Sequence, residues 1–175
     1  MAPSFDTTDL ATPRMRLRRY RSSDLEAFQS LMSDVEVNRY VAGGALEGSE
    51  AADLFEKVFD IYARRQFAVW AVEEWESAHY MGHAELKPRA GERGLELIYL
   101  LERPAWGQGL GTELARAIRN HAIRDLGVRP VLATIHPENE ASRRILVKLD
   151  FGFVREWKEP DDNVPTCLWA TTGEG

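Results

Sequence analysis

Three glycines lie between a predicted strand and a predicted helix, where they could bind a phosphate group. Gly107, Gly109 and Gly111 belong to the stretch 104–113, Pro-Ala-Trp-Gly-Gln-Gly-Leu-Gly-Thr-Glu. Glycine allows backbone N–H groups to approach a ligand without a Cβ atom in the way. The first N–H groups of the following helix also lack partners and carry partial positive charge. The N–H groups of residues 108–112 are therefore predicted to bind a phosphate or pyrophosphate.

Two common nucleotide-binding loops do not fit this spacing. The dinucleotide motif requires Gly-x-Gly-x-x-Gly, but its last position is Thr112 when counted from Gly107 and Leu114 when counted from Gly109. A P-loop requires Gly-Lys-Ser/Thr, which does not follow here. A tight turn without a ligand is the structural alternative, although three glycines exceed what a turn requires.

The elements on each side of the loop follow from hydrophobic spacing. Residues 95–101 are rich in apolar side chains and predict a strand. Apolar residues then recur at helical spacing to about residue 126, and Gly127 ends the predicted helix. Residues 130–135 predict a further buried strand. A strand, a helix and a strand in this order imply that 95–101 and 130–135 are parallel.

The rest of the chain supplies the remaining layers of a mixed α/β fold. Ser23-x-x-Glu26 has the pattern of a capping box for a first helix, and Ser49 is the predicted cap of a second, with Leu54 and Phe59 on its buried side. Residues 34–40 predict a short helical turn. Further strands are predicted at 15–20, 67–72, 80–86, 151–157 and 166–171, with a helix at 140–149. We expect one domain, 12–172, after a loose lead-in at 1–11.

The composition narrows the class of protein. The net charge of −6 argues against binding to a nucleic-acid backbone. Cys167 is the only cysteine, so the chain cannot form an internal disulfide. No signal peptide is evident, and no apolar run approaches the roughly 18–20 residues of a membrane span. We therefore expect a cytoplasmic protein without nucleic-acid or membrane partners.

A local run of arginines is the exception to this charge balance. Arg14, Arg16, Arg18, Arg19 and Arg21 lie on or next to the first predicted strand. Alternate residues of a strand point to the same side, so we expect these arginines to form a solvated face.

Four segments together resemble the GCN5-related N-acetyltransferase (GNAT) superfamily, with the RimJ/RimL-like branch as the closest match. They are the opening strand and helix 15–26, the strand segment Glu-Leu-Ile-Tyr-Leu at 96–100, the loop 106–114, and Asn-Glu-Ala-Ser at 139–142 with Leu-Asp-Phe-Gly-Phe at 149–153. Trp106 fills the first position of the loop pattern, as is familiar in that branch. The resemblance covers about residues 12–170.

The resemblance implies both a fold and an activity. The fold would be a strongly twisted mixed sheet of six or seven strands, flanked by helices on both faces. Its parallel strands 95–101 and 130–135 would splay apart, with the pantetheine arm of acetyl-CoA in the gap. The implied activity is transfer of the acetyl group from acetyl-CoA to a primary amine, by direct attack in a ternary complex and without a metal. Homodimers are common in this branch.

The resemblance also implies roles for particular residues. A backbone N–H near Leu100 and Leu101 would bind the thioester oxygen as negative charge develops on it. Glu96 is our candidate for removing a proton from the ammonium substrate, with Glu85 and His83 as alternatives. A glutamate paired with an arginine is the structural alternative for Glu96.

The later motif and the loop complete the candidate site. Asn139 would contact the pantetheine arm, and Ser142 would donate a proton to the thiolate that leaves; both residue types are also ordinary helix N-caps. Arg144, or Arg143, could reach the phosphates of CoA. The loop residues predicted to bind CoA are Trp106, Gly107, Gln108, Gly109, Leu110, Gly111 and Thr112.

The acceptor amine is not identified by these motifs. The walls of its site would be residues 35–50 and the loop after Trp157, where Glu36, Glu47, Asp161 and Asp162 suit a cationic amine or simply a solvated acidic surface. A protein N-terminus and a small-molecule amine are both compatible acceptors. A non-catalytic acyl-CoA-binding module and an unrelated nucleotide-binding protein are the alternatives to an enzyme.

Overall fold

A computed structural model describes residues 5–158 and 164–172, and these form an eight-stranded sheet. The strand order is β1-β2-β3-β4-β5-β6-β8-β7. One strand more than expected is present because a two-residue strand precedes the first predicted one. The strands are β1 (Leu10–Ala11), β2 (Met15–Arg18), β3 (Ala68–Glu74), β4 (Tyr80–Pro88), β5 (Leu95–Leu101), β6 (Val131–Ile135), β7 (Phe151–Lys158) and β8 (Pro165–Thr171).

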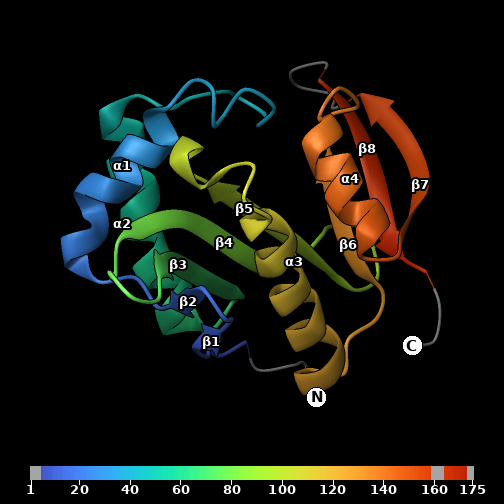
Figure 1. The fold of residues 1–175 in the computed structure, drawn as a ribbon, viewed down its shortest axis with the longest axis horizontal. Coiled ribbons are helices and arrows are strands. Elements are labelled where there is room, and N and C mark those ends of the chain that lie inside the picture. Colours follow the sequence, from blue (N-terminus) through green and yellow to red (C-terminus); the bar gives the residue numbers. More distant parts are fainter. Residues whose placement is uncertain (1–4, 159–163, 173–175) are drawn as a thin grey trace.

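Helices cover both faces of this sheet (Figure 1). Helices α1 (Leu25–Ser33) and α2 (Gly48–Arg64) pack on the face that carries Val69 and Ala71. Helix α3 (Leu110–Asn120), which continues as a π-helical turn over His121–Asp125, packs with α4 (Glu140–Lys148) on the opposite face. Alternate residues of β3 thus enter two separate cores, which explains its continuous apolar sequence.

All neighbouring strands are antiparallel except β5 and β6, which are parallel. The parallel pairing comprises only Leu95 with Val131 and Glu96 with Leu132, after which the two strands separate. Strands β6, β7 and β8 with α4 consequently form a distinct part of the molecule in Figure 1. The predicted splayed pair of parallel strands is confirmed.

Two glycines allow the backbone to approach closely around β5. At Gly94, where φ is +95°, a Cβ atom would lie 2.0 Å from the carbonyl oxygen of Pro130. At Gly82, a Cβ would lie 2.3 Å from the carbonyl oxygen of Leu100. Both separations are far below van der Waals contact, so any side chain would displace backbone. The first glycine holds the start of β5 against the residue before β6, and the second holds its end against β4.

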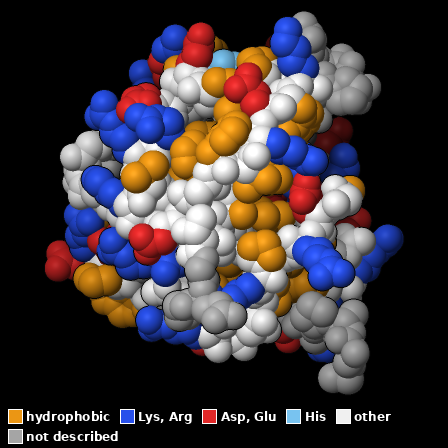
Figure 2. Space-filling model, turned by 90° about the vertical axis from the view of Figure 1, so that its right-hand side faces the viewer, with side chains coloured by type: hydrophobic (Ala, Val, Ile, Leu, Met, Phe, Trp, Pro, Cys, Tyr) orange, Lys and Arg blue, Asp and Glu red, His pale blue; other side chains and the backbone are white. Residues whose placement is uncertain are grey.

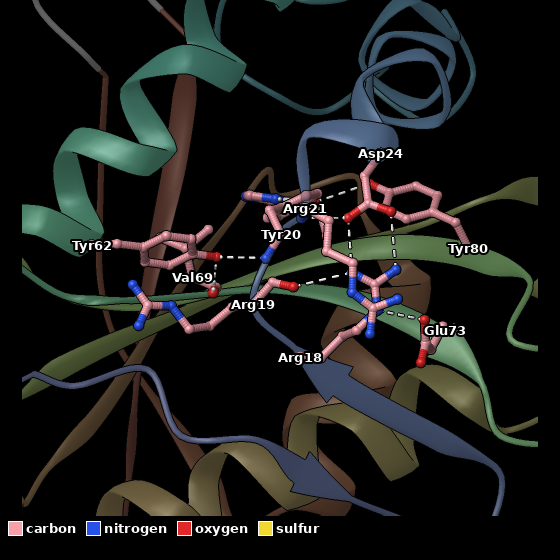
Figure 3. Close-up of polar contacts among 10 residues, drawn as sticks. Arg18, Arg19, Tyr20, Arg21, Asp24, Tyr62, Val69, Glu73 and Tyr80 are labelled. Atoms are coloured by element: carbon pink, nitrogen blue, oxygen red, sulfur yellow. Dashed lines mark hydrogen bonds and ion pairs between the residues drawn. The ribbon is translucent and has the colours of Figure 1, made fainter.

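The arginine run forms the expected solvated face only in part: Arg14, Arg19 and Arg21 are exposed, but Arg18 is buried. Arg18 is 5% exposed and lies between two carboxylates, with its guanidinium 2.8 Å from Asp24 and 2.5 Å from Glu73 (Figure 3). The carboxylates keep the pKa of this buried arginine above its ordinary value. Arg19 instead lies over the ring of Tyr62, 4.2 Å from the ring centroid. Arg18 thus joins β2, β3 and the start of α1.

This ion pair also changes the start of the first helix. The predicted cap, Ser23, lies within a 3₁₀ turn at Ser22–Asp24, and α1 begins at Leu25. Asp24 accepts the backbone N–H of Arg21 as well as the guanidinium of Arg18. The predicted cap Ser23 is therefore wrong. Asp24, which lies within the Ser-x-x-Glu pattern, makes these hydrogen bonds instead.

Residues 34–40 form consecutive turns, in which the N–H of Asn38 donates to the carbonyl oxygen of Asp34 as in one helical turn. Two other local expectations differ from the structure. The cap of α2 is Glu47, whose backbone N–H donates to Glu50, so the predicted cap Ser49 is wrong. Leu54 and Phe59 are more than one-third exposed, because α2 buries only the narrower stripe of Ala51, Phe55 and Val58.

The chain before β2 contacts the rest of the fold. Thr7 is buried, and the carbonyl oxygen of Thr8 accepts the indole N–H of Trp70 at 2.8 Å. Residues 5–11 are therefore not the loose lead-in that we expected. Among the helices of the described residues, none combines the length and apolar character needed to cross a membrane.

Removing the Arg18 side chain should strongly destabilise the fold. Arg18→Met leaves two buried carboxylates without their cation, so we expect the free energy of unfolding to fall by about 3 kcal/mol. Arg16→Met is the matched control, because Arg16 makes an exposed ion pair with Asp9, 2.9 Å away, and should cost less than about 1 kcal/mol. Urea unfolding measures both; equal losses would show that Arg18 has no special structural role.

Candidate active site

The gap between β5 and β6 opens into a cavity of about 330 Å³. One end is lined by the loop between α1 and α2, including Tyr40. The other is lined by the start of α4, including Ser142. Tyr99 and Leu100 of β5 and Thr134 of β6 are among the side walls. The cavity thus passes between the strands and is reached by elements from both faces of the sheet.

Unpaired backbone groups of β5 face this gap. The N–H of Leu95 donates to Pro130 on the β6 side at 3.3 Å, and the N–H of Glu102 donates to Met81 on the β4 side at 2.9 Å. Successive residues of a strand point their N–H groups to alternate sides, and the β4–β5 register has no shift. The N–H groups directed toward β6 therefore include that of Leu101, along with those of residues 97 and 99.

Leu100 and Leu101 have different roles in this geometry. The N–H of Leu100 is directed toward β4, whereas its side chain lines the cavity. The N–H of Leu101 is directed toward the gap, where β6 has already separated. Of the two predicted donors, Leu101 is the one whose N–H is available to a ligand.

The glycine loop has the backbone shape that the sequence predicted. Gly107 and Gly109 have φ angles of +73° and +76°, and α3 begins immediately afterwards at Leu110. Its first backbone bond joins the N–H of Glu113 to the carbonyl oxygen of Gly109, at 3.1 Å. The N–H groups of residues 110–112 consequently have no partner within the helix, as an anion site at a helix N-terminus requires.

Side chains fix the loop at its beginning. The indole N–H of Trp106 donates to the carbonyl oxygen of Leu101, at 2.8 Å, and so joins the loop to the end of β5. The amide of Gln108 donates to the carbonyl oxygen of Pro104, at 2.6 Å. Trp106 is 48% exposed, so it contacts the strand while leaving a ring edge in solvent.

Gly111 brings α3 close to the gap. A Cβ at this position would lie 3.0 Å from the side chain of Ile145 in α4 and 3.7 Å from the hydroxyl of Tyr99. The first turn of α3, the start of α4 and the side chain of Tyr99 therefore meet at one place. The loop residues 106–112 and Leu101 are not among the residues that line the cavity, but Gly111 adjoins Tyr99, which is one of them.

Asn139 and Ser142 line the cavity, and they also cap α4. The side chain of Asn139 accepts the backbone N–H of Ser142 at 3.1 Å, so Asn139 is the N-cap. Ser142 lies close enough to the hydroxyl of Tyr99 on β5 to offset part of the effect of burial on the pKa of that tyrosine. Burial raises the pKa of Tyr99 to about 12, so its hydroxyl remains protonated near neutral pH.

Tyr99 is a site residue that the sequence interpretation missed. The segment after α4 that resembles the family has Phe151 and Phe153 and no tyrosine. The tyrosine comes instead from β5 and reaches Ser142 across the gap. The available signal was a single hydroxyl within an otherwise apolar strand, on the side of the strand opposite to Glu96.

Glu96 is buried behind the cavity wall. It is 2% exposed, accepts the hydroxyl of Thr134 at 2.5 Å, and lies 3.3 Å from the guanidinium of Arg89. Glu96 itself does not line the cavity, but Thr134 and Arg89 do. The arginine pair that we had considered as a structural alternative is present, and the hydroxyl of Thr134 gives Glu96 a hydrogen-bonded route to the cavity.

The two alternatives to Glu96 belong to a buried chain of hydrogen bonds. Tyr80 contacts Tyr20 at 3.0 Å, Tyr20 contacts Nδ1 of His83 at 2.8 Å, and Nε2 of His83 contacts Glu85 at 3.0 Å. Burial alone would raise the pKa of Glu85, but His83 and Lys87 outweigh it and lower the pKa to about 2. Glu85 is consequently a weak proton acceptor, and both ring nitrogens of His83 are occupied.

The two arginines that could reach the phosphates of CoA lie on the surface of α4. Arg144 and Arg143 are exposed and both pair with Glu140, at 3.0 Å and 2.6 Å. These ion pairs lower the pKa of Glu140 to about 2. Neither arginine lines the cavity.

An aromatic pair lines the end of the cavity that lies beside the loop between α1 and α2. Tyr40, from the loop between α1 and α2, stacks on His136 at the end of β6, with ring centroids 5.2 Å apart. Glu36 is exposed and Glu47 caps α2, so neither lines the cavity. Asp161 and Asp162 lie outside the described residues. Within residues 5–158 and 164–172, no group of three or more histidine, cysteine or acidic side chains could hold a metal ion.

Comparison with known proteins identifies this architecture. The family model described as an acetyltransferase (GNAT) domain matches residues 14–152 of this chain. The uncharacterized N-acetyltransferase YoaA of Bacillus subtilis (strain 168) is 28% identical over 157 residues, which cover 85% of this chain and 86% of YoaA.

Solved structures show the same fold at low sequence identity. A GNAT-family acetyltransferase from Bacillus anthracis has a TM-score of 0.80 and 19% identity, covering 93% of this chain and 97% of its own. A RimL ribosomal L7/L12 alpha-N-protein acetyltransferase, solved in complex with coenzyme A, has a TM-score of 0.77 and 14% identity over the same shares. The resemblance to the GNAT superfamily is confirmed, and the RimL structure shares its fold.

The buried chain of hydrogen bonds that ends at Glu85 should make the free energy of unfolding depend on pH. Because the pKa of Glu85 is lowered on folding, its stabilisation is complete above the unfolded value near 4.5 and is lost as the pH falls toward 2. Wild-type protein should lose up to about 3 kcal/mol more than Glu85→Gln over this range. Urea unfolding at pH 6 and pH 3 measures the difference; parallel losses in both proteins would contradict this role.

Proposed function

The chain belongs to the GNAT acetyltransferase family, and we propose that it acetylates a primary amine by direct attack in a ternary complex. The family and the N-acetyltransferase relatives make it an acetyl-CoA-dependent acyltransferase. We propose a protein N-terminus or a small-molecule amine as the acceptor. A likeness to RimL supports the first of these classes.

One observation carries the proposal: the gap in the sheet joins two backbone sites that a CoA thioester needs. The loop at Gly107–Gly111 offers N–H groups for a pyrophosphate, and β5 offers those that β6 has left unpaired. Acetyl-CoA supplies the acetyl group as a thioester, whose carbonyl oxygen gains negative charge during attack. We propose that the N–H of Leu101, which is directed toward the gap, stabilises that charge.

Ser142 and Tyr99 are proposed to deliver the proton that the departing thiolate requires. With Tyr99 donating to the oxygen of Ser142, the serine proton is free to point into the cavity. Since the pKa of Tyr99 is raised, the tyrosine stays neutral and can act as this donor. Asn139 holds the backbone of Ser142 in place.

Glu96 and Thr134 are proposed to accept the proton of the substrate ammonium. A proton that leaves the amine reaches the oxygen of Thr134, while the hydroxyl proton of Thr134 passes to Glu96 along their 2.5 Å contact. The amine is then neutral and nucleophilic. Thr134 supplies the link that the buried position of Glu96 requires.

Ligand-dependent thermal shifts test the cofactor assignment. We expect acetyl-CoA and CoA to raise the melting temperature, with ATP and NAD giving no comparable shift. Release of free thiol with a panel of amines and peptide N-termini then identifies the acceptor. Stabilisation by neither CoA species would overturn the proposed function, and binding without thiol release for any amine would indicate a non-catalytic module.

Gly109→Trp should abolish binding of CoA without unfolding the protein. The left-handed backbone at Gly109 disfavours any side chain, and an indole there would displace Arg14, whose Nη2 lies 3.7 Å from a Cβ at this position, and would so disturb the loop N–H groups. Gly91→Trp is the matched control, since Gly91 has a φ of +78° in an exposed turn with no atom near its Cβ position. Isothermal titration with CoA distinguishes the two; retained binding by Gly109→Trp would contradict the assigned loop.

Ser142→Ala should lower kcat by about 100-fold while leaving the Kd for CoA within about threefold, because proton donation acts in the chemical step. Tyr99→Phe should lower kcat in the same direction by a smaller factor, since Ser142 retains its own proton. Steady-state kinetics with the acceptor from the amine panel, together with titration of CoA, measures both. An unchanged kcat in Ser142→Ala would remove this residue from the mechanism.

A further inference from the structure

Arg14, which directly precedes β2, contacts the cofactor loop although it lies 99 positions before Glu113 in α3. Its Nη1 donates to the carbonyl oxygen of Gln108 at 2.9 Å, and its Nε donates to Glu113 at 2.8 Å. The backbone N–H of Arg14 donates to the second oxygen of Glu113 at 3.0 Å. A single arginine therefore connects the loop, the first turn of α3 and the edge of the sheet.

We propose that Arg14, held by Glu113, is a positioning residue that aims the loop N–H groups at the pyrophosphate of CoA. This inference rests on the proposed function. Arg14 does not line the cavity, and its guanidinium lies behind the loop, where its Nη2 would be 3.7 Å from a Cβ at Gly109. It acts through the peptide that joins Gln108 to Gly109.

The planarity of that peptide is the physical basis of the effect. In a trans peptide the C=O of one residue and the N–H of the next point in nearly opposite directions. A guanidinium that holds the carbonyl oxygen of Gln108 on one side therefore directs the N–H of Gly109 to the other. Without this contact, the glycines at 107 and 109 would leave the peptide free to rotate, because both accept either sign of φ.

Glu113 orients the guanidinium rather than the ligand. One carboxylate oxygen, Oε2, lies 2.8 Å from Nε and 2.7 Å from Nη2 of Arg14, while Oε1 accepts the backbone N–H of Arg14, so the guanidinium is held on one side and Nη1 is left to reach Gln108. Burial alone would raise the pKa of Glu113, but hydrogen bonds from Thr12 and Arg14 together outweigh burial, so the pKa lies below its ordinary value. The pair is thus charged at neutral pH, and its two charges largely cancel at the loop.

Positioning and simple charge attraction make opposite predictions for Glu113→Gln. Removing the carboxylate leaves the positive charge of Arg14 uncompensated near the loop. If Arg14 acted mainly by charge, this variant would bind CoA more tightly. If Arg14 acts by orientation, the guanidinium is released and CoA binds more weakly.

The experiment measures Kd by isothermal titration for two ligands, CoA and pantetheine, which lacks the pyrophosphate. We expect Arg14→Met, Arg14→Lys and Glu113→Gln each to raise the Kd for CoA about tenfold, because an oriented charge-assisted contact is lost. The Kd for pantetheine should stay within about twofold. Arg16→Met, which removes an exposed arginine of the same strand, should change neither value.

Each other outcome overturns a defined part of the inference. Tighter or unchanged binding of CoA to Glu113→Gln contradicts positioning, as does equal weakening of CoA and pantetheine in the Arg14 variants. If wild-type protein binds CoA and the Arg14 variants bind it equally well, only the role of Arg14 fails. If wild-type protein does not bind CoA, the proposed function fails and the role of Arg14 fails with it.

Discussion

The parallel pairing of β5 with β6 ends after two residue pairs, and the site depends on that ending. A sheet normally pairs the N–H and C=O groups of adjacent strands, and an unpaired buried group costs free energy. Here the N–H groups of residues 99 and 101, which are directed toward β6 beyond the last pair, are left for another partner. The separation is stable because each strand remains antiparallel to a different neighbour, β4 for β5 and β8 for β6. The space filled by a ligand is therefore created by strand pairing on its two outer sides.

The chemical groups around this gap come from elements that are far apart in the sequence. Tyr99 extends from β5 toward Ser142 at the start of α4, and Thr134 extends from β6 toward Glu96. Each pair brings residues of two elements together across the gap. Proton donation to a leaving group and proton removal from an amine are thus assigned to opposite faces of the same strand. Their separation follows from the alternation of side chains along β5.

Several acidic and basic side chains that the sequence offered as candidates for function form ion pairs within the protein. Arg18 is enclosed by two carboxylates, Glu85 by His83 and Lys87, and Glu140 by two arginines. These groups fix backbone and side-chain positions rather than contact a ligand. Other surface features have no assigned role. Figure 2 shows an apolar strip on the face that carries β7, where Phe153 and Val154 are more than half exposed.

The sequence was informative where one physical preference acts alone. The bounds of β5 were predicted to the residue, because an apolar run lies between Gly94 and Pro104, and the loop was predicted because glycines accept positive φ. Prediction failed where distant groups compete. Asp24 replaced Ser23 at the first helix because Arg18 binds it, and no periodicity reveals that a tyrosine of β5 meets a serine of α4.

The contact between Arg14 and the loop limits how far the glycine motif can serve as a separate module. Residues 104–113 contain the glycines and the start of the helix, but the guanidinium that fixes the Gln108 carbonyl comes from the N-terminal strand. A protein engineer who transplanted only this segment to another strand–helix junction would transfer a flexible loop with unassigned peptide orientations. A portable version has to carry the arginine, or an equivalent donor behind the loop, as well as the motif itself.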